Sequence, residues 1–132
     1  MPKIMVVDDE EAIVQLIKFL MEREQFEVIE AYNGLEAYHK LTEDGPNKAA
    51  PDVIILDIMM PVMDGYTLQS KLLERDGAGA IPIIILTAHG QMKELFLNSN
   101  IFAFVEKPLE SKNFVKIVRE ALALKRGCPR FN

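Results

Sequence analysis

The sequence has little cysteine and no long hydrophobic run. Cys128 is the only cysteine among 132 residues, so an internal disulfide and a multi-cysteine zinc site are both excluded. No apolar run approaches the ~18 residues that a membrane span requires, and no basic-then-apolar secretion signal opens the chain. We therefore expect a protein of the reducing cytoplasm without a membrane partner.

Basic residues are also in the minority. Lys and Arg number 15 against 20 Asp and Glu, which gives a formal net charge of −5. Phosphate backbones are bound mainly by clustered Lys and Arg, so the sequence argues against a direct nucleic-acid partner. The composition, 49% apolar and 27% charged, is typical of a folded domain rather than a disordered chain. At this length we expect a single domain over residues 1–132.

Five short apolar runs predict the strands of a sheet. The first, third and fourth runs are continuously apolar and rich in Val and Ile, which is typical of strands covered by helices on both faces. The second run alternates polar and apolar residues, which favours an edge strand. The runs are Lys3–Val7, Phe26–Ala31, Val53–Leu56, Ile83–Leu86 and Ile101–Val105.

Helical patterns separate these runs. The patterns predict helices over Glu10–Arg23, Gly34–Leu41, Asp64–Arg75 and Gln91–Asn98, and a long final helix that follows Ser111. Strand and helix therefore alternate five times. Right-handed crossovers then give an α/β fold with a doubly wound, five-stranded parallel sheet, (βα)5, because five units are too few to close a barrel.

Local signals refine three of these helices. Asn33 is placed to cap the second helix, with Glu36 three residues on to close a capping box, and Ser111 is placed to cap the last. The residues expected on the inner face of the first helix are Ala12, Ile13, Leu16, Ile17 and Leu20. Those expected on the inner face of the last helix are Phe114, Val115, Ile117, Val118, Ala121 and Leu122.

Polar residues follow four of the predicted strands. Asp8 and Asp9 follow the first, Asp57 the third and Thr87 the fourth, and Lys107 lies just beyond the fifth. In a doubly wound sheet all these positions lie at the carboxyl edge, where ligands bind. The sequence therefore predicts that three carboxylates, a hydroxyl and an ammonium meet at one edge.

Each residue taken alone has an ordinary structural explanation. An Asp after a strand is usually a turn former or a helix cap, Thr87 could cap the next helix, and Lys107 could be a surface charge. The three carboxylates together need compensation, because a like-charged pair ~4 Å apart costs about 1 kcal/mol in water and ~4 kcal/mol at a dielectric of 20. Lys107 and a divalent cation could provide it, and all-oxygen ligands select Mg²⁺. These parts suit phosphoryl transfer to a carboxylate, which would give an aspartyl phosphate.

Four segments in order carry a resemblance to a known family. They are Val6–Glu10 (VVDDE), Leu56–Gly65 (LDIMMPVMDG), Thr87–Ala88 (TA) and Lys107–Pro108 (KP). With them the chain resembles, over essentially its whole length, the receiver domain of bacterial two-component response regulators. The resemblance implies a receiver domain with the flavodoxin-like strand order 2-1-3-4-5. It also implies a signalling domain rather than an enzyme, at most phosphorylating itself from small donors and slowly dephosphorylating itself. From the length of the chain we expect no output domain.

The resemblance also implies residue roles. Asp57 would be the phosphoacceptor, supplied by a sensor histidine kinase or a phosphotransfer protein. Asp9, Asp57 and the Met59 backbone carbonyl would bind Mg²⁺ directly, and Asp8 largely through water. Lys107 would pair with Asp57 or with the phosphoryl group, and its peptide bond to Pro108 would be cis.

The same resemblance implies a switch. The Thr87 hydroxyl would bind a phosphoryl oxygen and move inward, and Phe104 would swing into the space behind it; without the resemblance Phe104 is an ordinary core aromatic. The surface of the fourth helix, fifth strand and fifth helix would then bind a downstream protein. The sequence leaves the identity of that target and phosphorylation-dependent homodimerisation open.

Other functions fit less well. A degenerate receiver that binds partners without phosphorylation is the main alternative, although all five pocket residues are present. A dehalogenase-like phosphatase would carry D-x-D after the first strand, where this chain has Asp8, Asp9 and Glu10. A flavodoxin-like cofactor binder would need Ser, Thr or Gly in that loop to bind a phosphate. The segment from Thr87 to Lys107 is slightly short for the family, which affects the expected output surface and not the phosphorylation site.

Overall fold

A computed structural model describes residues 2–42, 50–57, 81–87, 101–106 and 110–125. Within them, five parallel strands form one sheet in the order β2-β1-β3-β4-β5. This confirms the predicted strand order and the position of the second strand at an edge. The strands are β1 (Lys3–Val7), β2 (Glu27–Ala31), β3 (Val53–Asp57), β4 (Ile83–Thr87) and β5 (Ile101–Glu106).

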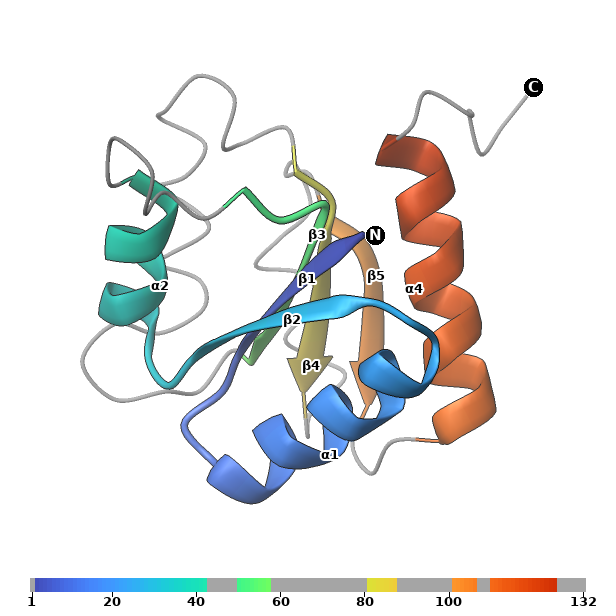
Figure 1. Cartoon of the computed structure of the whole chain (residues 1–132), viewed down its shortest axis with the longest axis horizontal. Helices are drawn as coiled ribbons and strands as arrows, with labels where there is room; N and C mark the ends of the chain where they lie inside the picture. The colour runs from blue at the N-terminus through green and yellow to red at the C-terminus, as the bar shows by residue number, and fades with distance from the viewer. Residues whose placement is uncertain (1, 43–49, 58–80, 88–100, 107–109, 126–132) are drawn as a thin grey trace.

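Helices cover both faces of the sheet, as a doubly wound fold requires. In Figure 1, α1 (Glu11–Arg23) and α4 (Ser111–Lys125) lie on one side of the strands and α2 (Gly34–Thr42) on the other. The predicted helices Asp64–Arg75 and Gln91–Asn98 lie outside the described residues. In the part of the chain that the structure describes, no helix is long and apolar enough to cross a membrane.

The alternation of side chains along each strand divides the core into two clusters. The cluster between the sheet and α1 and α4 includes Ile17, Met21, Phe114 and Val118, all 1% exposed or less. Burial of each such side chain contributes about 1.5–3 kcal/mol. The cluster beneath α2 includes Ala37 and Leu41 with strand residues such as Met5, Ile54 and Ile85. Strand β3 is buried along its whole length, which agrees with its continuously apolar sequence.

The first helix packs with a face that only partly matches the predicted one: Ile17 and Leu20 are buried as predicted, and Ile13 packs against the core. Its buried residues are Val14, Ile17, Leu20 and Met21, whereas Leu16 is 43% exposed and Ala12 is exposed. Apolar residues occur around most of this helix, so periodicity alone does not choose between the two faces. The contacts of α1 with the sheet and with α4 determine which face is buried. The predicted inner face of α4 is confirmed, with Phe114, Val118, Ala121 and Leu122 buried and Val115 and Ile117 packed against them.

The helix caps follow the predicted positions only in part. The Glu36 N–H donates to Asn33 Oδ1 at 2.8 Å, as a cap should, but the Glu36 carboxylate accepts from the Tyr32 N–H at 3.3 Å rather than from Asn33. Ser111 is wrong as the cap of α4, because it is the first helical residue. Glu110 caps α4 instead, and its side chain accepts the Asn113 N–H at 2.9 Å.

Candidate functional site

Strand register places the acidic residues together at the carboxyl edge of the sheet. β1 and β3 are adjacent and parallel, with Val7 opposite Leu56. Asp8 comes directly after β1, and Asp57 is the last residue of β3. The chain therefore delivers one carboxylate from each of two adjacent inner strands at the same level.

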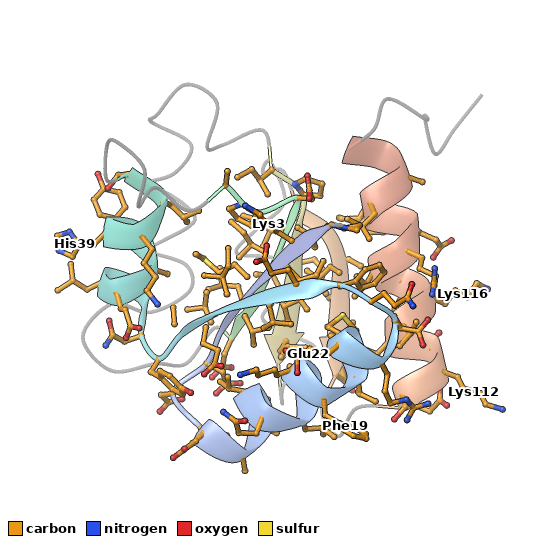
Figure 2. All side chains as sticks on the ribbon, viewed as in Figure 1. Lys3, Phe19, Glu22, His39, Lys112 and Lys116 are labelled. Carbon is orange, nitrogen blue, oxygen red and sulfur yellow. The ribbon has the colours of Figure 1, made fainter. Side chains whose placement is uncertain are left out.

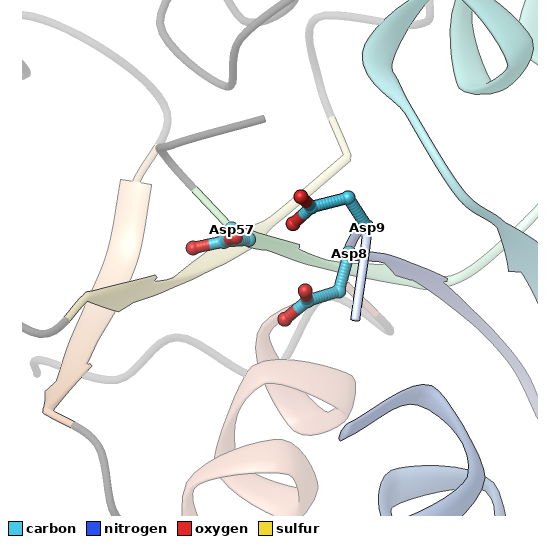
Figure 3. Close-up of side chains that lie close together, drawn as sticks. All are labelled: Asp8, Asp9 and Asp57. Atoms are coloured by element: carbon cyan, nitrogen blue, oxygen red, sulfur yellow. The ribbon is translucent and has the colours of Figure 1, made fainter. Parts of the chain in front are cut away.

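Asp8, Asp9 and Asp57 form a cluster (Figure 3) in which one carboxylate oxygen from each residue lies within 4.8 Å of the other two. Asp8 is fully buried and Asp57 is 5% exposed, while Asp9 is exposed. Two carboxylates are thus largely shielded from water and the third faces it. Like charges at this spacing repel, and burial strengthens the repulsion, so the cluster favours a cation.

Backbone contacts hold Asp8 in place. Its N–H donates to the Ala31 carbonyl oxygen of β2 at 3.1 Å, and its Oδ1 accepts the Glu10 N–H at 2.9 Å. The second contact is an Asx turn that starts α1. Sequence reasoning considered Asp8 and Asp9 as partial helix caps but did not identify the Ala31 contact. The signal for it lies in the pairing of the first two strands, which the sequence alone does not align.

The remaining predicted site residues lie on or near the same edge. Thr87 is the last residue of β4 and pairs with Glu106 of β5. Phe104 pairs with Ile85, is half-buried, and packs against the core cluster beneath α2. Lys107, Pro108 and Met59 lie outside the described residues. The structure therefore brings the three carboxylates together and places the Thr87 backbone on the neighbouring strand.

The described carboxylate cluster can do two things chemically. Its oxygens are the donors that a hard divalent cation prefers. A carboxylate can also act as a nucleophile and form a mixed anhydride. Both roles require a second component, either a cation or an electrophile. Because Asp9 is exposed, such a component can reach the cluster from solvent.

Comparisons with known proteins agree with this fold and site. The sequence model of the response regulator receiver domain matches residues 4–119. The chain is 38% identical over 122 residues to the transcriptional regulatory protein SrrA of Staphylococcus aureus, a match that covers 91% of this chain and 47% of SrrA. The chain therefore spans about half the length of that relative.

Solved structures show the same architecture. The chemotaxis protein CheY4 of Vibrio cholerae superimposes with a TM-score of 0.81 at 28% identity, covering 92% of this chain and 98% of the other. A response regulator receiver domain from Clostridium thermocellum gives a TM-score of 0.82 at 29% identity, with 98% and 100% covered.

Proposed function

The chain belongs to the response regulator receiver domain family, and from this premise we propose that Asp57 accepts a phosphoryl group from a phosphohistidine. The donor would be a sensor histidine kinase or a phosphotransfer protein, the partners with which receiver domains interact. The single observation that carries the proposal is the convergence of Asp8, Asp9 and Asp57 at the carboxyl edge.

The transfer is a displacement at phosphorus. A carboxylate oxygen of Asp57 attacks the phosphorus atom, the P–N bond breaks, and its electron pair returns to the imidazole nitrogen of the donor. The product is an aspartyl phosphate on Asp57. The end of a central strand suits this role, because the strand holds the nucleophile rigidly for in-line attack.

The same carboxylates suit one Mg²⁺ ion, which would supply charge neutralisation at the phosphoryl oxygens. One carboxylate oxygen of each Asp lies within 4.8 Å of the other two, so a single cation could be shared among them. As the family resemblance implies, Asp9, Asp57 and the Met59 carbonyl would bind Mg²⁺ directly, and the buried Asp8 would act largely through water.

The other residues complete the proposal. Lys107, held by a cis bond to Pro108, would pair with Asp57 or the phosphoryl group, and the Thr87 hydroxyl would bind a phosphoryl oxygen. Phe104 would then swing into the space behind Thr87. The surface that this changes comprises the segment Gln91–Asn98, β5 and α4, to which a downstream protein or a second copy would bind.

The proposal concerns residues 1–132 as one receiver domain acting in the cytoplasm. It would act through its partners and not as an enzyme, apart from phosphorylating itself from small donors and slowly losing the phosphoryl group.

Metal-dependent stability tests the assignment of the cluster. Ligand at 100 times its dissociation constant stabilises the folded state by about 2.7 kcal/mol, so Mg²⁺ should raise the melting temperature of the wild type. Asp9→Asn should lose most of this shift. Asp52→Asn is the matched control. Asp52 lies just before β3 and accepts the Lys3 N–H, so it is at the amino-terminal ends of the strands, away from the carboxylate cluster. An undiminished Mg²⁺ shift in Asp9→Asn would overturn the metal assignment.

A further inference from the structure

Strand β2 forms one edge of the sheet, and no described strand pairs with its outer side. In Figure 1 it crosses in front of the other strands. Ala31 faces β1, because its carbonyl oxygen accepts the Asp8 N–H. Backbone groups alternate in direction along a strand, so the Glu30 carbonyl and the Tyr32 N–H point away from the sheet.

Two side chains of α2 occupy these outward-facing groups. Lys40 Nζ donates to the Glu30 carbonyl oxygen at 2.5 Å, and Glu36 Oε2 accepts the Tyr32 N–H at 3.3 Å. Lys40 and Glu36 are one helical turn apart and form an ion pair at 3.3 Å between Nζ and Oε1. A hydrogen-bond donor, Lys40, and an acceptor, Glu36, thus lie beside the end of the edge strand and are paired with each other.

A strand added to this edge would use the same two positions. It would donate an N–H to the Glu30 carbonyl and accept the Tyr32 N–H through one of its own carbonyls. The ammonium and carboxylate of the Lys40–Glu36 pair take the places of that N–H and that carbonyl. The pair therefore imitates part of a sixth strand.

The strand that fits this edge best is β2 of a second copy. Antiparallel pairing about Ile29 places Val28 opposite Glu30, and both residues point their backbone groups outward. Glu27 then lies opposite Ala31, so no two carboxylates face each other across the pair. Open edges of this kind pair readily with other chains.

We propose that the Lys40–Glu36 pair closes the β2 edge and prevents two copies of the chain from pairing through it. Glu30 is also held from the other face of the sheet. Its carboxylate binds Lys18 Nζ of α1 at 2.9 Å and accepts the Tyr32 hydroxyl at 2.5 Å. Helices α1 and α2 together hold the end of β2 in place. Because the β2 edge is closed in this way, any association of two copies on phosphorylation would use another surface.

Removal of both charged groups tests this proposal. The double variant Glu36→Met/Lys40→Met removes both the acceptor and the donor and keeps side chains of similar length. We expect it to self-associate as concentration rises in analytical ultracentrifugation, whereas the wild type does so less or not at all. Hydrogen exchange at the Val28 and Glu30 amides should slow on the order of tenfold or more as the double variant associates. The amides of Ile29 and Ala31, already turned toward β1, should change little.

A matched pair on α4 provides the control. Lys116 and Glu120 are exposed and have the same spacing, and Lys116 projects from α4 in Figure 2. Lys116→Met/Glu120→Met should behave as the wild type does. A folded double variant at α2 that associates no more than this control would overturn the proposal, as would association without protection at Val28 and Glu30. If the double variant does not fold, Lys40→Met alone frees the Glu30 carbonyl and is judged by the same criteria.

Discussion

At the scale of single residues, the charge of Asp57 has two opposing consequences. It supplies the nucleophile. It also adds a negative charge beside Asp8 and Asp9, on a residue that is only 5% exposed. Without Mg²⁺, Asp57→Asn should therefore stabilise the fold by about 1 kcal/mol, the low end of the repulsion between carboxylates ~4 Å apart. Thermal unfolding in a chelating buffer measures this. A clear fall in the melting temperature would show that Asp57 holds the fold together through its contacts.

Glu30 gives a residue-scale prediction about pH. The Tyr32 hydroxyl first, and then Lys18, lower the pKa of Glu30 below its ordinary value by hydrogen bonding. A carboxyl group with a lowered pKa in the folded state stabilises the fold at pH values above its pKa in the unfolded state, about 4.3. This stabilisation is lost as the pH falls through the pKa of the folded state. Glu30→Gln should thus melt below the wild type at pH 7, with the difference narrowing in acid. A gap in melting temperature between Glu30→Gln and the wild type that stays constant with pH would contradict the assignment.

At the scale of elements, the end of α1 carries a strained residue. Gln25 has φ 67° and follows the helix, where its N–H donates to the Glu22 carbonyl and the Phe26 N–H to the Met21 carbonyl. This is the Schellman motif, in which glycine is preferred. Gln25→Gly should therefore stabilise the protein by about 1 kcal/mol in chemical denaturation. Gln25→Ala keeps the Cβ atom and should not; equal stability of the two variants would contradict the explanation.

The elements also show what a sequence can and cannot predict. Short apolar runs identified all five strands, and the continuous Val- and Ile-rich signal of β1, β3 and β4 reflects burial on both faces. Alternation in β2 identified an edge. The buried face of α1 was predicted only in part, since apolar residues on several sides of this helix make its orientation depend on tertiary contacts. Glu110 was missed as a cap because Ser111, a commoner capping residue, stands beside it.

The candidate site was predictable for a topological reason. Parallel strands end at one edge, so residues that follow β1 and β3 must meet there, and Asp8, Asp9 and Asp57 do. The burial of Asp8 and its contact with Ala31 were not predictable, because both depend on strand register. The Lys40–Glu36 pair was equally hidden, since an i,i+4 ion pair in a sequence does not reveal which backbone groups it reaches.

At the scale of the whole molecule, the fold assembles a site from segments far apart in the chain. The adjacent inner strands β1 and β3 lead to Asp8 and Asp57, the inner strand β4 carries Thr87, and the edge strand β5 carries Phe104. A chemical change on Asp57 is thus two strands away from Phe104, across β4. This arrangement suits a domain that reports phosphorylation to a partner through its surface.

The most direct test is the intact mass of the protein after incubation with Mg²⁺ and a small phosphodonor. The wild type should gain the mass of one phosphoryl group, and the gain should disappear on mild hydrolysis of the acyl phosphate. Asp57→Asn should gain nothing under the same conditions. Failure of the wild type to gain mass, or an equal gain in both proteins, would contradict Asp57 as the phosphoacceptor and favour a binding module that works without phosphorylation.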